Sequence, residues 1–267
     1  MTAPLILLPP SEGKATGGTG APWAPGSGSF PELDTSRAKV AAALKRAMRS
    51  NATSVGKLLG VKGDALAAAR DGNREVLTRP TMAAIERYTG VLYDALDYAS
   101  LPARSRKRGD DQLVVFSGLW GLVRPTDPLP DYKLKMGASL APYGRLATFW
   151  RPQITAALDP LVNGRTVWDL LPNEHAAAWQ PDDGSFGARI SVRFVDDVGD
   201  GPERKLTVVS HWNKLLKGAL VRHILATQID DPTGLAAFDH PLGYRYVPSL
   251  TETTGGRTNV SLVARRD

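Results

Sequence analysis

A hydroxyl, a carboxylate and an amine lie within four positions near the start of the chain, at Ser11, Glu12 and Lys14. The apolar run at residues 5–8 predicts a buried strand, which ends at the two prolines that follow because proline donates no ladder hydrogen bond. Polar groups just past the end of a strand are typical of functional sites, since loops on a rigid scaffold carry chemistry. Lys14 could serve as an amine nucleophile or stabilise charge, and Glu12 could serve as an acid or a base. An ordinary polar turn would explain the same residues.

Two short helices joined by a glycine turn are predicted over about residues 53–70. The turn Gly60-Val61-Lys62-Gly63 and the start of the second helix present backbone N–H groups that can bind an anion, and Lys57 and Lys62 add positive charge. The pattern resembles a helix-hairpin-helix, a motif that binds the DNA backbone without sequence preference. The usual hairpin reads Gly-Val-Gly, whereas a lysine stands between Val61 and Gly63 here. The alternative is a helical hairpin in which glycine only allows the turn.

A dense group of functional side chains follows a second predicted strand at residues 113–117. Arg124, Tyr132, Lys133 and Lys135 all occur in one proline-rich segment, together with Asp127. Arginine can contact phosphate with two parallel hydrogen bonds, tyrosine can stack or donate a hydrogen bond, and lysine supplies a point charge. The prolines reduce the entropy cost of holding such a loop in place. A rigid surface loop with solvated charges is the alternative.

A third basic segment lies on a helix predicted over residues 214–229. Lys214, Lys217 and Arg222 are spaced at i, i+3 and i+8, close enough to one face to form a stripe. Gly218 costs roughly 1 kcal/mol in a helix interior and permits the close approach of another group. A basic stripe is also typical of a solvated helix face.

The elements that must position these groups indicate an α/β protein with a mixed sheet, or an α+β protein, as a single domain over residues 1–267. A mobile loop is predicted at residues 13–28. Further helices are predicted at residues 37–50, 81–98 and 146–158, with a helix start at 175–179. Further strands are predicted at residues 166–171 and 259–264, with an antiparallel pair formed by 190–195 and 206–210 around a turn at 196–202.

Composition narrows the classes of partner. The 267 residues carry a net charge of +6 and a sequence pI of about 9.6, which favours anionic partners. Cysteine is absent and only four histidines occur, so we expect no disulfide-linked partner, no metal and no cofactor. No targeting segment or long apolar stretch occurs, which predicts a soluble, cytoplasmic protein without a membrane partner.

Several motifs together match one known family. They are Leu8-Pro9-Pro10-Ser11-Glu12-Gly13-Lys14, the run from Ser117 to Asp127, Met136-Gly137, Phe149-Trp150, Asp169-Leu170 leading to Glu174, Phe238 and Gly243-Tyr244. They resemble the YaaA family of peroxide-stress, DNA-binding proteins, also known as domain of unknown function 328. The resemblance spans nearly the whole chain. It implies one compact α/β domain with a positively charged cleft beside a helix-hairpin-helix, binding of duplex or distorted DNA, and protection of DNA and iron balance under hydrogen peroxide.

The chain departs from the family pattern at two places. Lys133-Leu134-Lys135-Met136 stands where Arg-Leu-Glu-Met is usual, so that a cation replaces a carboxylate. Leu171-Pro172 replaces Ala-Ser, and His175 replaces a tyrosine. The resemblance therefore gives no role to Lys135 or His175.

Three functions remain open from the sequence. The first is a DNA-binding stress protein in which Gly60 and Gly63 form a phosphate-binding turn. The other residues expected to contact the DNA are Ser11, Lys57, Lys62, Arg124, Tyr132, Lys133, Lys214, Lys217 and Arg222. The second is an enzyme, similar to a DNA glycosylase or lyase, that acts on a nucleobase or its glycosidic bond with Glu12 and Lys14. The third is a binder of a nucleotide or another phosphate ligand in the same cleft.

Overall fold

This computed structural model describes residues 3–182, 184–199, 203–209 and 212–266. Most of its strands form one large mixed sheet. Within these residues the main sheet has nine strands, which are β1 (Leu5–Leu8), β3 (Leu113–Ser117), β4 (Gly121–Val123), β8 (Thr166–Asp169), β9 (Ala188–Val198), β10 (Lys205–Val208), β11 (Arg245–Tyr246), β12 (Glu252–Thr254) and β13 (Arg257–Arg266). Two small two-stranded sheets pair β2 (Met82–Ala83) with β5 (Pro128–Leu129) and β6 (Ser139–Leu140) with β7 (Gly144–Arg145). The mixed α/β class predicted from the sequence is confirmed.

The centre of the sheet is parallel. Strand order runs β11-β13-β9-β8-β1-β3-β4, with β10 beside β9 and β12 beside β13. β1 pairs in parallel with both β3 and β8, and its four residues are fully buried. A strand covered on both faces reads as a continuous apolar run, which explains the sequence Leu-Ile-Leu-Leu. The carboxyl ends of β1, β3 and β8 therefore meet at one edge of the sheet.

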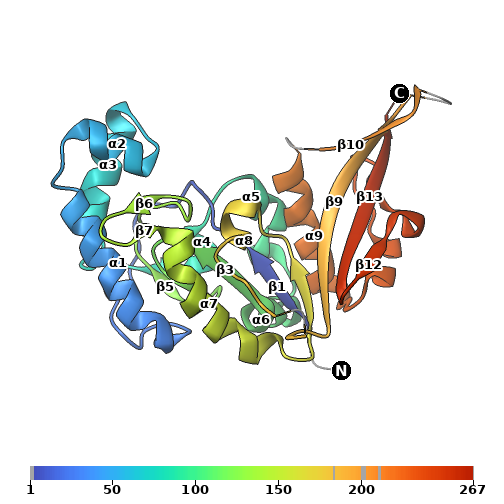
Figure 1. Cartoon of the computed structure of the whole chain (residues 1–267), viewed down its shortest axis with the longest axis horizontal. Coiled ribbons are helices and arrows are strands. Elements are labelled where there is room, and N and C mark those ends of the chain that lie inside the picture. The colour runs from blue at the N-terminus through green and yellow to red at the C-terminus, as the bar shows by residue number, and fades with distance from the viewer. Residues whose placement is uncertain (1–2, 183, 200–202, 210–211, 267) are drawn as a thin grey trace.

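Helices surround this sheet. They are α1 (Asp34–Ala47), α2 (Ala52–Leu59), α3 (Gly63–Arg74), α4 (Ala84–Arg87), α5 (Val91–Leu96), α6 (Ala103–Gln112), α7 (Leu146–Val162), α8 (Asn173–Ala176) and α9 (Asn213–Thr227). Short 3-10 turns occur at η1 (Pro31–Leu33), η2 (Tyr98–Ser100), η4 (Pro232–Ala237) and η5 (Pro248–Leu250). The pair α2 and α3 stands at one end of the molecule, and β9, β10 and β13 stand at the other (Figure 1). In the described part of the chain, no helix has the length and apolar character needed to cross a bilayer.

The single helix predicted over residues 81–98 is wrong. The segment instead forms β2, the single turn α4, an extended stretch and then α5. Gly90 has φ +98, a conformation that interrupts a right-handed helix, and α4 ends at Tyr88 with extended backbone. Competing pairing explains the break, because Thr81 exchanges two backbone hydrogen bonds with Gly20 and Arg87 O accepts one from Ala15 N.

The loop at residues 13–28, predicted to be mobile, is held by hydrogen bonds. The buried Arg87 guanidinium donates to the carbonyls of Ala15, Gly17 and Leu129, the Gly17 bond measuring 2.8 Å. Lys14 also forms an isolated bridge with Tyr88. A charged side chain that is fully buried must be hydrogen-bonded, and Arg87 satisfies this requirement with backbone carbonyls.

The other predicted elements are confirmed, with shifted ends. The helices predicted at 37–50, 146–158 and 214–229 correspond to α1, α7 and α9. The predicted strand at 166–171 is β8, which ends at Asp169, and the strand predicted at 259–264 extends to β13. The helix start predicted at 175–179 is α8, which begins and ends earlier. β9 and β10 pair antiparallel as predicted, while residues 200–202 of the turn and Ser210 lie outside the described residues.

Candidate functional site

The carboxyl edge of the sheet brings together side chains that are far apart in the sequence. The segment from Ser11 to Lys14 follows β1, Ser117 ends β3, and Leu170 follows β8 and donates its amide to Leu7 O at 3.1 Å. Gly118 lies against the backbone of Leu134 and Lys135, where an added Cβ would come within 2.6 Å of Lys135 C. This close approach brings the 132–135 segment to the same edge.

Lys14 lies in an aromatic setting. Its amine is 4.3 Å from the ring centroid of Tyr132 and 5.6 Å from that of Tyr88, and it donates to Ser11 O at 3.0 Å. Burial lowers the pKa of the Lys14 amine to about 7, with Lys133 acting in the same direction, while Asp131 and Glu12 oppose the shift. An amine that is buried beside two rings and another cation loses solvation without gaining a full counter-charge.

A chain of hydroxyl groups lies beneath this amine. The Tyr132 hydroxyl is 2.7 Å from Ser117 Oγ and 2.9 Å from the Tyr88 hydroxyl. Ser117 Oγ also accepts the amide of Trp120 at 3.0 Å. Burial raises the pKa of Tyr132 to about 12 and that of Tyr88 well above its usual value, so both rings remain neutral phenols at physiological pH.

Glu12 faces the opposite electrostatic situation, because lysines surround it. Its carboxylate is 3.1 Å from Lys135 Nζ and 3.8 Å from Lys133 Nζ. The hydrogen bond from Lys135 lowers the pKa of Glu12, and the charges of Lys133 and Lys214 add to this effect. The buried Asn73 amide of α3 fixes the Lys133 backbone, since it donates to Lys133 O at 2.8 Å and accepts Lys133 N at 2.9 Å.

The predicted hairpin forms between α2 and α3. Asn51 caps α2 by accepting Ser54 N at 2.9 Å, and Gly60 ends it in the left-handed conformation with φ +68. α3 begins at Gly63, whose φ is +56, and no side chain caps its first turn. The Lys135 amine lies 3.6 Å from where a Cβ on Gly60 would stand, so the turn adjoins the lysines around Glu12.

The basic helix α9 contributes its first turns to the same edge. Lys217 donates to Leu170 O at 2.8 Å, just beyond the end of β8. Burial lowers the pKa of the Lys217 amine, and Asp169 opposes the shift. Lys214, one turn earlier, is exposed, and its charge helps to lower the pKa of Glu12. Lys57 and Lys62 are also exposed.

Two predicted arginines and one glycine lie elsewhere. Arg124 donates to Asp111 O at 2.6 Å, at the opposite end of β3 from Ser117. Arg222 donates to Asp97 O at 2.7 Å and so caps the carboxyl end of α5. The close approach that Gly218 permits is to α5 and not to a ligand, since an added Cβ would lie 2.1 Å from Leu92 O.

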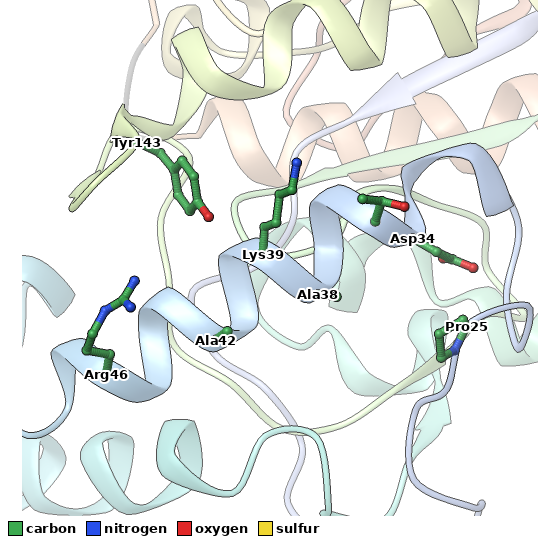
Figure 2. Close-up of a pocket in the computed structure, with 8 residues that line it drawn as sticks. Pro25, Asp34, Ala38, Lys39, Ala42, Arg46 and Tyr143 are labelled. Carbon is green, nitrogen blue, oxygen red and sulfur yellow. The ribbon is translucent and has the colours of Figure 1, made fainter.

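A separate hollow of about 600 Å³ lies along α1 and is wide open to solvent. Figure 2 shows it lined by side chains of α1, with Tyr143 at one end and Pro25 at the other. Its carboxylate, Asp34, is already bonded to Arg37 at 2.8 Å and to Gly26 N at 2.7 Å. Because none of the residues around Lys14 line it, the hollow is distinct from the site at the sheet edge. Across the described residues, no cluster of three or more acidic, histidine or cysteine side chains could hold a metal ion.

Three residues of this site escaped the sequence reasoning. Tyr88 lies within the single helix predicted over residues 81–98, and Gly90 was the local signal that this helix is interrupted. Lys135 received no role, although its position two residues after Lys133 in an extended loop directs both side chains to one side. Asn73 carries no signal in the sequence, because only the fold reveals that its amide meets the Lys133 backbone.

Comparison with known proteins decides the family. A family model described as "Peroxide stress protein YaaA" matches residues 5–250. The chain belongs to the YaaA family. A UPF0246 protein of Streptomyces coelicolor is 41% identical over 256 residues, which cover 95% of each chain. A UPF0246 protein of Corynebacterium glutamicum is 37% identical over 222 residues, covering 82% of this chain and 83% of the relative.

Against this YaaA family background, the two departures in sequence have different surroundings. Lys135 takes part in the site, where it pairs with Glu12 and adjoins the hairpin turn. His175 lies in α8, where burial lowers the pKa of its imidazole to about 4 and Nδ1 has no hydrogen-bond partner among the described residues. The neighbouring Glu174 accepts the amide of Gly137 at 2.9 Å and so holds the end of the 132–137 segment.

Proposed function

We propose that this YaaA family protein binds the backbone of duplex DNA through the turn between α2 and α3 and the lysines beside it. The observation that carries the proposal is the position of Lys135, whose amine adjoins Gly60 on one side and pairs with Glu12 on the other. Through this contact the hairpin turn adjoins the lysines around Glu12, namely Lys133, Lys135 and Lys214.

The surface has the composition that phosphate binding requires. Five lysines contribute positive charge, namely Lys57, Lys62, Lys133, Lys135 and Lys214. Their counter-charge is small, because Glu12 is the carboxylate that pairs with this group among the described ion pairs and its side chain is 62% exposed. The uncapped amides at the start of α3 add donors for a phosphate oxygen.

Asp64 limits how a phosphate can approach. It lies in the first turn of α3, where its negative charge competes with an anion for the same amides. We therefore place the phosphate on the Lys62 side of the turn, next to Lys135. Contacts of this kind read the backbone and not the bases, so binding is expected to be nearly independent of sequence.

The test is charge reversal on the hairpin. A Lys57→Glu, Lys62→Glu double variant should bind a short fluorescent duplex about tenfold more weakly or worse, because two phosphate contacts are lost and repulsion is added. Lys107→Glu with Lys205→Glu is the matched control, since both lysines are exposed and lie on α6 and β10, away from the hairpin. Equal affinities of the two double variants would contradict the proposal. Thermal stabilisation by a mononucleotide, without binding of duplex, would favour a nucleotide binder instead.

A further inference from the structure

The Lys14 amine has an orientation and a support that a solvated surface lysine lacks. It donates to Ser11 O at 3.0 Å and points over the face of Tyr132. The segment around it is fixed from the other side, since Ser11 Oγ accepts Thr89 N at 3.1 Å and Lys14 bridges to Tyr88. The amine is therefore held in place while its side chain remains partly accessible to solvent.

The charges around Lys14 leave it without a close partner. Among the described residues no carboxylate lies within ion-pair distance of its amine, and the adjacent Glu12 is engaged by Lys133 and Lys135. The charged groups that face it are Lys133 and Arg87, which disfavour the ammonium form, and Asp131 and Glu12, which favour it. With its pKa lowered to about 7, mainly by burial, a substantial fraction of the amine is uncharged at neutral pH.

Lys217 is a second lysine at this edge whose amine pKa is lowered by burial, and its neighbours differ from those of Lys14. Its amine is also partly buried, but Leu170 O accepts its hydrogen bond at 2.8 Å and Asp169 stabilises its charge. Lys14 donates a similar hydrogen bond to Ser11 O, but its amine also faces the rings of Tyr132 and Tyr88 and the charge of Lys133. A fixed primary amine that is partly uncharged at neutral pH is a nucleophile for carbonyl carbon.

We propose that Lys14 forms an imine with the aldehyde of a deoxyribose that has lost its base within duplex DNA. The inference rests on the proposed DNA binding, because the lysines around Glu12 would hold the phosphates that flank such a sugar. It deepens that function by naming a class of damaged DNA and the residue that reacts with it.

The chemistry of this step balances without a metal or redox partner. The Lys14 nitrogen attacks C1′ of the ring-opened sugar, a C–N bond forms, and the carbonyl C–O bond breaks. The two amine hydrogens leave with the carbonyl oxygen as water, and a C=N bond remains. Tyr132 and Tyr88 stay neutral phenols throughout. They therefore place no phenolate charge beside the amine, which would favour its protonated form.

The experiment is reductive trapping with sodium borohydride. The parent protein should form a covalent adduct with a duplex that contains one abasic site and none with the intact duplex of the same sequence, and peptide mass spectrometry should place the adduct on Lys14. Lys14→Arg should keep DNA affinity, because it keeps a cation, and should lose the adduct by about tenfold or more. Lys205→Arg, on the distant strand β10, is the control that should trap as the parent does.

The possible failures separate the two proposals. If the protein binds the abasic duplex but no adduct forms, or if Lys14→Arg traps as well as the parent, the imine is wrong while DNA binding stands. If neither duplex is bound at any salt concentration, both the DNA-binding proposal and the imine on DNA are overturned. An adduct located on another lysine would contradict the assignment to Lys14 alone.

Discussion

Lys14 and Glu12 are two residues apart, yet their surroundings push their protonation in opposite ways. Glu12 is held as an anion by Lys135, whereas Lys14 is driven towards the neutral amine by burial beside Tyr132. The backbone between them bends at Gly13. The amide of Thr89 donates a 3.3 Å hydrogen bond to Gly13 O and so holds this bend in place. Two adjacent groups with separated protonation states are the arrangement that acid–base and amine chemistry use.

The lowered pKa of Lys14 predicts a pH-dependent stability. The unfolded chain binds more protons than the folded one between pH 7 and the ordinary lysine value of 10.5, so the free energy of unfolding rises with pH across that window. Below the window the cost of protonating the buried amine is fully present. Lys14→Met removes that cost, so the variant should be more stable than the parent below pH 7 and lose this advantage towards pH 10.5.

Urea denaturation at a series of pH values measures this difference. Lys205→Met is the control, since Lys205 is exposed on β10. A stability difference between Lys14→Met and the parent that stays constant across the window would show that Lys14 titrates as an ordinary lysine.

At the scale of elements, the α2–α3 hairpin depends on two glycines for different reasons. Gly60 ends α2 with φ +68, and Gly63 opens α3 with φ +56. An added side chain at Gly63 meets nothing within 4 Å, so its space is open and only its backbone conformation restricts substitution. The left-handed backbone conformation, and not the space around Gly63, therefore makes this position sensitive to substitution.

Gly63→Val should therefore weaken DNA binding, because a β-branched residue in this conformation costs roughly 1–2 kcal/mol and favours a rearranged turn. Gly63→Asn should bind nearly as the parent does, since asparagine tolerates the left-handed region. Anisotropy titrations together with melting curves separate a local change from unfolding. A folded Gly63→Val protein with unchanged affinity would remove the hairpin from the interface.

Elements with a strong local pattern could be predicted, and those decided by long-range pairing could not. The apolar runs of β1 and β3 and the hairpin glycines were visible in the sequence. The break in the helix predicted at 81–98 had only Gly90 as a local signal, because hydrogen bonds from the distant loop at 13–20 compete for that backbone.

The sequence predicted part of the candidate site in the same way. Glu12, Lys14, Tyr132 and Lys133 were identified because they follow strand ends in the chain. Arg124 and Arg222 are basic like the lysines of the site, but they lie outside it. Their guanidinium groups donate to the backbone carbonyls of Asp111 and Asp97 instead. Residue type and spacing therefore indicate the chemistry, while the topology decides which groups meet.

At the scale of the whole molecule, the parallel strands gather the site and the helical hairpin extends it. β1, β3 and β8 end at one edge, and the hairpin lies at the end of the molecule away from β13 (Figure 1). Part of the positive charge lies near Glu12, where Lys133, Lys135 and Lys214 are close to its carboxylate and Lys135 adjoins the hairpin turn.

Salt dependence of duplex binding tests this account most directly. If the basic surface neutralises about five phosphates, affinity should fall on the order of a hundredfold or more between 50 and 200 mM salt, and equally for unrelated duplex sequences. The slope of log affinity against log salt should be less steep by about two in the Lys57→Glu, Lys62→Glu variant, because each lost phosphate contact removes about 0.9 from the slope. An affinity that barely changes with salt, or that depends strongly on one sequence, would contradict backbone binding by these lysines.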